Sequence, residues 1–268
     1  MIGILRARLR LGHQTIAFPG GAARLPARFR GRPALAPDRC AAGCAAGCAD
    51  VCPTGAVLGT GAAGLAIDAG ACVFCGRCQE ACPARAIVFT RDHRLAMRAR
   101  EELVVRGDAP TLARALDGRM RRLFGRSLKL RQVSAGGCGG CEAELNAAGN
   151  VQFDLGRFGI QFVASPRHAD GLVVTGPVGA NMRDALRRTW EATPAPRLLV
   201  AVGACAISGG VFAGSPVCGD GLDGAIAGVP VDLYVPGCPP HPVTLIDGLL
   251  RLLGRLEGDR PESLAGAP

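Results

Sequence analysis

Residues 72–83 read Cys-Val-Phe-Cys-Gly-Arg-Cys-Gln-Glu-Ala-Cys-Pro, which is a Cys-x2-Cys-x2-Cys-x3-Cys-Pro run. A cubane iron–sulfur cluster needs thiolates that converge on one point, and a loop with cysteine at every third position supplies three. The fourth cysteine, which precedes proline, turns away toward a neighbouring cluster. A zinc ribbon is the alternative, but it uses two separated Cys-x2-Cys knuckles rather than three closely spaced cysteines. The run therefore predicts a 4Fe-4S cluster.

A similar run lies about thirty residues upstream, and residues 36–92 form an internal two-fold repeat. The upstream run has three residues between successive cysteines and spans two residues more than the other. Its first two intervals read Ala-Ala-Gly, and glycine permits backbone angles that still aim the sulfurs inward. In two-cluster ferredoxins the fourth cysteine of each run binds the other cluster. This crossed pattern assigns Cys40, Cys44, Cys48 and Cys82 to one cube, and Cys72, Cys75, Cys78 and Cys52 to the other.

A third set of cysteines is dispersed and consists of Cys138-Gly-Gly-Cys141, Cys205 and Cys238. The alternative for the first pair is a thioredoxin-like redox motif. Four glycines around that pair favour a loop that wraps closely around an inorganic body, whereas a thioredoxin pair opens a helix directly. Cys218 is left over, and a small buried thiol is the default interpretation.

Strands and helices alternate from Gln132 onward, which predicts a parallel sheet covered by helices. Ligands in such sheets gather at the carboxyl ends of the strands, and Cys205 and Cys238 each follow a predicted strand. The uncharged stretch 198–219 is long enough to span a bilayer, but its glycines and proline favour a buried strand and a loop. A helix is predicted at 111–124 between the two halves. The strands are predicted at 158–164, 171–175, 197–202 and 231–235, and the helices at 181–191 and 243–256.

Composition limits the class of protein. The chain has 268 residues and 49% apolar content, enough for one or two domains with a hydrophobic core. Its thirteen cysteines are odd in number and tightly clustered, so metal ligation in a reducing compartment is favoured over a disulfide framework. Aromatic residues make up only 4%, which argues against nucleic-acid binding because stacking platforms are missing.

The formal net charge of +9 comes almost wholly from arginine, and residues 1–37 hold seven arginines and no acid. Such an arm has three interpretations: a targeting segment, a contact with anionic lipid or an acidic partner subunit, or a solvated tail. We favour docking to a partner.

Several other features have competing interpretations. Gly59-Thr60-Gly61-Ala62-Ala63-Gly64 matches a dinucleotide fingerprint as a string, but cysteine runs on both sides leave no room for the helix, so a loop is predicted. Glu142 and Glu144 follow Cys141 and are either solvated or a proton path beside a redox centre, which would require burial and a raised pKa. His168 and His241 are predicted to make polar contacts in turns rather than to bind metal.

The chain resembles two subunits of a membrane-associated group 4 nickel–iron hydrogenase joined end to end. Residues 1–105 resemble the ferredoxin-like subunit of the formate hydrogenlyase and complex I family, including Phe29-Arg30-Gly31-Arg32-Pro33. Residues 130–256 resemble the hydrogenase small subunit, which is similar to the 20 kDa subunit of complex I. The matching pieces there are Gly137-Cys138-Gly139-Gly140-Cys141-Glu142, Ser165-Pro166-Arg167-His168-Ala169-Asp170, Gly203-Ala204-Cys205, Ser208-Gly209-Gly210 and Val231-Asp232-Leu233-Tyr234-Val235-Pro236-Gly237-Cys238-Pro239-Pro240.

The resemblance implies an α+β two-cluster ferredoxin domain followed by an α/β flavodoxin-like domain with a parallel sheet. The implied segments are a basic arm (1–35), the ferredoxin domain (36–92), a linker helix region (93–130), the small-subunit-like domain (131–257) and a tail (258–268). It also implies three 4Fe-4S clusters, the proximal one held by Cys138, Cys141, Cys205 and Cys238 beside the active site of a separate large subunit.

The function implied is an electron-transfer subunit with the catalytic centre on a partner. The expected partners are a hydrogenase or complex I-like large subunit and other iron–sulfur and membrane subunits. The chain would be cytoplasmic, attached to the inner face of the membrane through those partners and without a span of its own. The complex I branch normally has adjacent cysteines where this chain has Cys138-x2-Cys141, which points to the hydrogenase branch. The alternatives are a nickel-free complex I-like quinone relay and a zinc-stabilised interaction protein.

Overall fold

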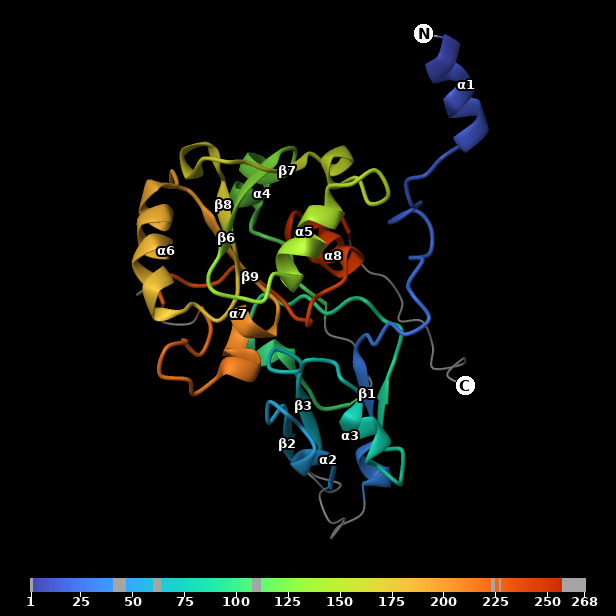
Figure 1. Ribbon diagram of the computed structural model, residues 1–268, viewed down its shortest axis with the longest axis vertical. Coiled ribbons are helices and arrows are strands. Elements are labelled where there is room, and N and C mark those ends of the chain that lie inside the picture. Colours follow the sequence, from blue (N-terminus) through green and yellow to red (C-terminus); the bar gives the residue numbers. More distant parts are fainter. Residues whose placement is uncertain are drawn as a thin grey trace.

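The computed structural model describes residues 2–40, 47–59, 64–107, 112–222, 225–226 and 228–256, which form two packed parts and an N-terminal arm (Figure 1). The larger part contains a parallel sheet with helices on both faces. The smaller part contains both regular cysteine runs and two short antiparallel sheets.

The large sheet has five parallel strands in the order β10-β9-β8-β6-β7. In chain order this is 2-1-3-4-5, the order of flavodoxin-like folds, whose switch point lies between the first and third strands. Those two strands here are β6 and β8. The strands are β6 (Leu128–Ser134), β7 (Ile160–Phe162), β8 (Gly171–Thr175), β9 (Leu198–Val202) and β10 (Leu233–Val235).

Helices cover both faces of this sheet because the central strands are apolar on both sides. In β8, Val173 packs into one core and Leu172 and Val174 into the other, as the two-residue period of a strand requires. Figure 1 shows α6 on one side of the sheet and α5 with α8 on the other. The helices are α4 (Gly118–Phe124), α5 (Gly140–Ala148), α6 (Ala180–Ala192), α7 (Ala204–Ser208) and α8 (Pro242–Leu252).

The smaller part repeats one unit twice, as the sequence predicts. In each unit a one-turn helix, α2 (Gly47–Asp50) or α3 (Arg77–Glu80), carries the third cysteine of its run and is followed by a strand. The backbone N–H groups of Ala56 and Ala86 donate to the sulfurs of Cys52 and Cys82, at 3.2 and 3.3 Å. The strands are β1 (Pro33–Leu35) paired with β4 (Ile87–Phe89), and β2 (Val57–Gly59), β3 (Ala66–Asp68) and β5 (Val104–Val105) in a second sheet.

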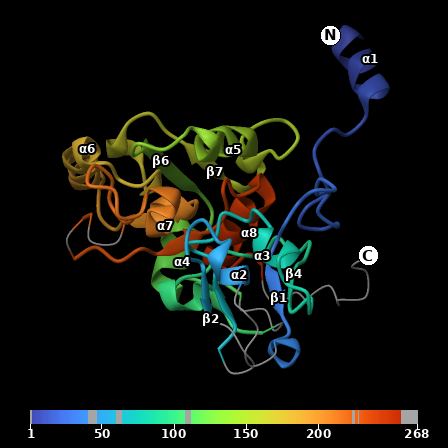
Figure 2. The ribbon, with the colours of Figure 1, turned by 60° about the horizontal axis from the view of Figure 1, so that its bottom comes forward.

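The region expected to be a linker helix instead joins the two parts closely. Met97 forms an antiparallel bridge with Tyr234 next to the large sheet, and β5 then adds a strand to the small sheet. Ser208 on α7 donates its hydroxyl to the carbonyl of Gly70, at 3.2 Å. Figure 2 shows α7 beside the cysteine-rich part. The two parts are therefore packed against each other rather than tethered.

Several predicted elements differ in their limits. The helix predicted at 111–124 begins only at Gly118, because the Asp117 carboxylate accepts the N–H groups of Arg119 and Met120 and caps it there. The helix predicted to reach residue 256 ends at Leu252, where Gly254 adopts a left-handed conformation (φ +67°). Strand β6 begins at Leu128, slightly before the expected domain boundary, and α5 was not predicted. Short 3-10 helices occur at η1 (Pro37–Arg39), η2 (Arg100–Leu103), η3 (Leu155–Phe158), η4 (Pro166–His168) and η5 (Gly210–Phe212).

The basic arm divides into a projecting helix and a docked strap. Helix α1 (Ile2–Leu11) has no buried residue and extends away from the body in Figure 1. Ile16 and Phe18 enter the core of the large part, and Arg157 donates to both of their carbonyl oxygens. Further along, Arg91 of the cysteine-rich part donates to the carbonyl of Leu25. The strap, defined as residues 15–27, therefore contacts both parts of the molecule.

Candidate iron–sulfur centres

The second cysteine run forms one four-sulfur group with the last cysteine of the first run. A single cavity is lined by Cys52, Cys72, Cys75 and Cys78. Strand β3 positions the loop, because the N–H of Cys72 donates to the carbonyl of Asp68 at 3.0 Å. Gly76 then takes a left-handed conformation (φ +82°) that begins α3 and turns Cys78 back toward the group.

The pKa values of these cysteines show that the four sulfurs lie close enough to affect one another's ionisation. The pKa of Cys72 rises to about 12, mainly because the thiol is buried and in smaller part because of the nearby charges of Cys78, Cys52 and Cys75. The pKa of Cys78 rises to about 11 for the same reasons. A backbone N–H from Phe74 donates to the sulfur of Cys72 at 3.3 Å, a contact that favours its charged form.

The first run forms a second group with the last cysteine of the second run. Cys40, Cys48 and Cys82 line one cavity together with the apolar side chains of Leu65 and Ile87. Cys44 lies outside the described residues. Cys52, the last cysteine of the first run, thus lies with the second run, and Cys82, the last of the second run, lies with the first.

The third group lies at the carboxyl edge of the parallel sheet, where ligands of such folds bind. Cys138 and Cys141 follow β6, Cys205 lies on α7 after β9, and Cys238 follows β10. The loop predicted for the pair is wrong at Cys141, which lies in the first turn of α5. The nearby Cys205 and Cys238, and not a loop conformation, therefore argue against a thioredoxin-like pair. Burial raises the pKa of Cys141 to about 12, followed by the charges of Glu142, Cys205, Cys238 and Cys138. These cysteines come from separate segments of the chain, and only the fold brings them together.

Glycines make room for this third group. A Cβ atom at Gly203 would lie 2.5 Å from the sulfur of Cys141, and its φ of +89° also disfavours other residues. Gly176 and Gly137 approach so closely that a Cβ on Gly176 would lie 2.5 Å from the nitrogen of Gly137. The matched pieces of sequence include Gly203 and Gly137, but nothing in the sequence marked their contacts.

The third group opens onto the surface, unlike the other two. Cys138 and Cys238 are exposed, whereas Cys72, Cys78, Cys40 and Cys48 are buried. Cys218 is half-buried rather than buried as predicted, and its charge contributes to the raised pKa of Cys205. Another protein could contact the exposed thiols of Cys138 and Cys238 directly.

The donor chemistry of all three groups fits iron–sulfur clusters. Several thiolates that repel one another in a buried site need bound metal to neutralise them. Among the described residues, no three His, Cys, Asp or Glu side chains are close enough to bind one ion. The thiolates of a cube each bind a different iron, so wider spacing is compatible with a cluster. No disulfide competes for the described cysteines, which are all free.

The two acids beside Cys141 differ in their environments. Burial alone would raise the pKa of Glu142, but hydroxyl donors on Ser134 and Thr175, both at 2.6 Å, lower it overall. Glu142 is therefore a carboxylate that ties α5 to the ends of β6 and β8. Burial raises the pKa of Glu144, so only Glu144 meets the condition for a proton carrier.

One cavity lies between the loop of the second run and the segment that carries Cys238. Val73 and Phe74 of the second run line one part of it, and 236–240, which includes Cys238, lines another. Glu144 and His241 also contribute to the lining. The imidazole of His241 caps α8 by accepting the N–H of Val243 at 3.2 Å, and it contacts Phe29 and Phe153 edge-on. His241 is thus a helix cap, and His168 is an exposed residue of η4.

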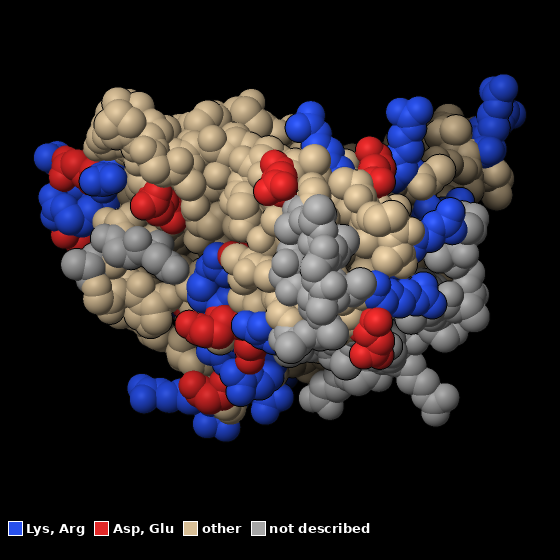
Figure 3. All heavy atoms as spheres, turned by 90° about the horizontal axis from the view of Figure 1, so that it is seen from below, with Lys and Arg blue, Asp and Glu red and all other residues tan. Residues whose placement is uncertain are grey.

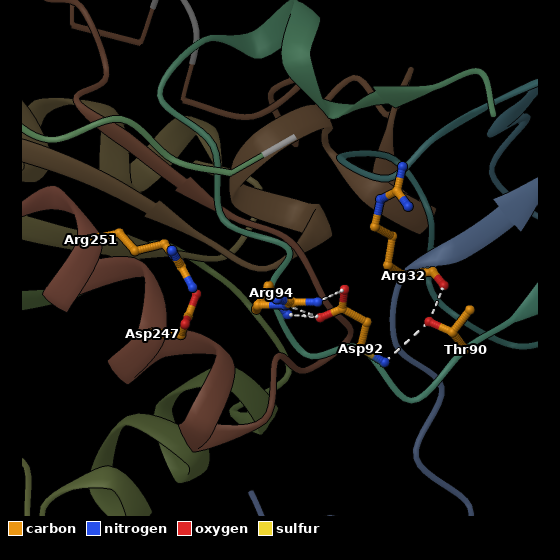
Figure 4. A network of polar contacts seen from close by, with 6 residues as sticks. All are labelled: Arg32, Thr90, Asp92, Arg94, Asp247 and Arg251. Carbon is orange, nitrogen blue, oxygen red and sulfur yellow. Dashed lines mark hydrogen bonds and ion pairs between the residues drawn. The ribbon is translucent and has the colours of Figure 1, made fainter. Parts of the chain in front are cut away.

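A polar network secures the strand that follows the second run (Figure 4). The guanidinium of Arg94 donates to both oxygens of Asp92, at 2.7 and 2.8 Å, and Asp92 donates its N–H to Thr90. The Thr90 hydroxyl in turn donates to the carbonyl of Arg32. Nearby on α8, Arg251 donates to Asp247 at 2.9 Å, with both side chains almost completely buried.

Two known families match the chain. Residues 138–252 match the family described as NADH ubiquinone oxidoreductase, 20 kDa subunit, and residues 65–88 match the 4Fe-4S binding domain. The second match contains the second cysteine run, and the first match contains the third group. The dispersed cysteines and the regular run thus belong to separately recognised units.

Similar curated proteins include three that align with about half of this chain. The chain is 42% identical over 135 residues to the probable membrane-bound hydrogenase subunit mbhJ of Pyrococcus furiosus, covering 50% of this chain and 79% of the relative. It is 45% identical over 132 residues to formate hydrogenlyase subunit 7 of Escherichia coli, covering 49% and 51%. It is 49% identical over 112 residues to an NADH-quinone oxidoreductase subunit of Desulfovibrio desulfuricans, covering 42% and 59%. The chain therefore spans little more than half of the latter two relatives.

The helices of the large part are short. Within the portion of the chain that the structure describes, no helix is both long and apolar enough to cross a bilayer. The uncharged stretch 198–219 contains the predicted strand as β9, but the predicted loop is partly helical and contains α7 and η5.

Proposed function

Because the chain belongs to the NADH ubiquinone oxidoreductase 20 kDa subunit family, we propose that it is an electron-transfer subunit of a membrane-associated nickel–iron hydrogenase or formate hydrogenlyase-type complex. It is an oxidoreductase component whose catalytic centre lies on a separate large subunit. Three 4Fe-4S clusters form the relay, at Cys40, Cys44, Cys48 and Cys82, at Cys72, Cys75, Cys78 and Cys52, and at Cys138, Cys141, Cys205 and Cys238.

The observation that carries this proposal is the exposure of the third group on the surface, next to the loop of the second. Cys138 and Cys238 are exposed, so a large subunit can cover this cluster directly. The cavity lined by Phe74 and Cys238 supports a relay in which the second group is the neighbour of the third. Electrons pass between the Cys40 group, the Cys72 group and the Cys138 group, and the last of these is proximal to the partner's active site.

When bound, the clusters supply one-electron chemistry that the side chains lack. The chain's own residues bury the sulfurs, exclude water with apolar side chains such as Leu65 and Ile87, and donate backbone N–H groups to three of the sulfurs. Such N–H contacts are one means by which a protein tunes cluster potential. Glu144 is the better proton carrier of the two acids near the proximal site, because burial raises its pKa.

The partners of the complex include the large subunit and other iron–sulfur and membrane subunits. The chain is cytoplasmic and associates with the inner face of the cell membrane through those subunits. The segments are a basic arm (1–35), a two-cluster ferredoxin domain (36–92), a linker region (93–130), the 20 kDa-like domain (131–257) and a tail (258–268).

A nickel-free, complex I-like quinone relay is the second candidate. The identity of 49% with an NADH-quinone oxidoreductase subunit favours it. The Cys138-x2-Cys141 spacing favours the hydrogenase branch, since the complex I branch normally has adjacent cysteines there.

The test is anaerobic purification of the native complex through a tag on this chain. In the complex we expect a large subunit with two Cys-x2-Cys pairs for nickel, and this chain purified without its partners should hold about twelve irons. Hydrogen gas alone should reduce the clusters, as seen by electron paramagnetic resonance. A large subunit without those pairs, with clusters that only quinol reduces, would establish the second candidate. Fewer than about eight irons would overturn the three-cluster relay, and zinc in place of iron would support an interaction protein.

A further inference from the structure

We propose that α1 is a lipid-binding helix that lies in the interface of an anionic bilayer. This goes beyond the relay function, in which membrane attachment is through partner subunits. It depends on neither the number of clusters nor the identity of the large subunit.

The first observation is that α1 exposes five large aliphatic side chains, at 61–84% of their full accessibility. They are Ile2, Ile4, Leu5, Leu9 and Leu11. A single exposed leucine needs no explanation, but a run of them on one short helix marks an interaction surface. A ten-residue helix is also marginal by itself in water, so it gains stability from a surface that buries these side chains.

The second observation is the charge that accompanies the apolar side chains. At 100° per residue, Ile2, Leu5 and Leu9 form one stripe, with Arg6 and Arg10 along one edge and Arg8 along the other. Ile4 and Leu11 extend the apolar surface beyond Arg8. Long arginine side chains can rise from an apolar surface to phosphate headgroups while their methylene stems stay buried.

The helix carries only positive charge, whereas the body carries both signs. No acid occurs before Asp38 in the sequence. Figure 3 shows basic side chains toward the rim of the molecule with acidic side chains among them. The charge of α1 therefore complements an anionic lipid surface, with no acidic neighbour on its own segment to neutralise it.

The chemistry of α1 favours lipid over a protein partner. Its ten residues are Ile, Leu, Gly, Ala and Arg, without an aromatic anchor or a neutral hydrogen-bonding side chain. Protein interfaces are rich in tyrosine, tryptophan and phenylalanine and need directional hydrogen bonds. Aliphatic and arginine side chains alone suit a fluid surface of acyl chains and phosphates.

The arm holds α1 where a membrane can reach it. The strap is anchored by the N–H of Ile16, which donates to the carbonyl of Gln152 at 2.9 Å, and by the Thr15 hydroxyl, which donates to Val151. Before this anchor, Gly12 takes a left-handed conformation (φ +63°) that ends the helix. Both ribbon views show α1 beyond this anchor and apart from the body.

The test is flotation of the purified full chain with vesicles of phosphatidylcholine, with and without phosphatidylglycerol. We expect binding only to the anionic vesicles, and weaker binding as salt concentration rises. Near an anionic surface each arginine contributes about fivefold in affinity, so Arg6→Gln/Arg8→Gln/Arg10→Gln should weaken binding by about a hundredfold. Leu5→Ser/Leu9→Ser should also weaken it strongly.

A matched variant separates this effect from net charge. Arg183→Gln/Arg187→Gln/Arg188→Gln removes three charges from α6 and should leave vesicle binding unchanged. Iron content and melting temperature should stay unchanged in the α1 variants, because α1 buries nothing against the body. Equal binding by the two arginine triples would overturn the proposal. Absence of vesicle binding, with partner subunits captured through α1, would overturn it as well and assign α1 to a protein interface.

Discussion

At the scale of single residues, the third cysteine group depends on positions that carry no side chain. Gly203 sits between β9 and α7, and the sulfur of Cys141 occupies the space where its Cβ would be. Cys141 can lie beside the segment that carries Cys205 only because Gly203 has no side chain. In the proposed relay, a residue with no chemistry of its own therefore controls whether the third cluster binds.

Gly203→Ala should abolish the proximal cluster and leave the other two in place. The added carbon would lie 2.5 Å from the Cys141 sulfur, far inside contact distance, and a φ of +89° adds strain. Iron should fall from about twelve to about eight per chain, with loss of one signal in electron paramagnetic resonance.

Gly214→Ala is the matched control for this variant. Gly214 also has a positive φ (+76°), but a Cβ there would meet no atom within 4 Å. It should keep all the iron, so backbone strain alone would not explain a loss at Gly203. Full iron content in Gly203→Ala would show that the third group is not a cluster site.

At the scale of elements, β3 and η2 hold the loop of the second run in place. Asp68 at the end of β3 accepts two hydrogen bonds from the guanidinium of Arg100, at 2.8 and 2.5 Å, and one from the N–H of Gly70. Its carbonyl accepts the N–H of Cys72. The ion pair thus links the junction between the two parts to the first ligand of the run.

Asp68→Ala should destabilise the protein by about 2 kcal/mol, because Gly70 and Arg100 lose a largely buried acceptor. Arg100 is partly exposed, so water offsets some of the loss. Thermal unfolding under anaerobic conditions should show a melting temperature lower by roughly 5 °C. Asp184→Ala, which breaks exposed pairs on α6, should not shift it measurably. Equal shifts in the two variants would contradict a structural role for the Asp68 pair.

At the scale of the whole molecule, the strap, the cysteine-rich part and α8 meet around His93. The ring of Phe18 from the strap packs edge-on against this imidazole, with centroids 5.5 Å apart. The pKa of His93 falls to about 4, mainly because the imidazole is buried; Asp92 opposes the shift, whereas the charges of Arg94, Arg251 and His241 add to it. Its buried Nε2 atom has no hydrogen-bond partner among the described residues. His93 is therefore neutral at physiological pH.

The stability of this junction should fall with acid. The unfolded chain binds a proton at His93 near pH 6.5 and the folded chain only near pH 4, so unfolding takes up a proton between these values. The contribution of neutral His93 to the free energy of unfolding is complete above about pH 6.5. Up to about 3 kcal/mol of it is lost as the pH falls toward 4. Thermal unfolding of the wild type and of His93→Gln, followed from pH 7.5 to 5, measures the difference.

The melting temperature of His93→Gln should depend less on pH than that of the wild type. His13→Gln should behave like the wild type, because His13 is exposed. Cluster loss in acid affects all three proteins alike and cancels in the comparison. A wild-type slope that persists in His93→Gln would assign the acid sensitivity to other groups.

The sequence by itself determined the parts of this protein that depend on local spacing. The Cys72–Cys82 run predicts its loop because cysteines with two residues between them converge without help from distant segments. Apolar runs such as 171–175 predict buried parallel strands, since both of their faces must be covered. The third cysteine group was also proposed from sequence, from the glycines around Cys138 and Cys141 and the predicted strand ends before Cys205 and Cys238, and the resemblance to a family assigned it the proximal cluster.

Only the tertiary structure decided what depends on contacts between distant segments. Segment 112–117 was expected to be helical but bonds to the end of α8 instead, with the N–H of Leu116 donating to Leu252. The strap was expected to belong to a basic arm that docks to a partner, yet Phe18 is buried against His93 of the same chain. Periodicity and spacing report a residue's neighbours along one element, whereas these contacts join segments separated by tens to more than a hundred residues. Their energies favour one arrangement only once both segments are folded.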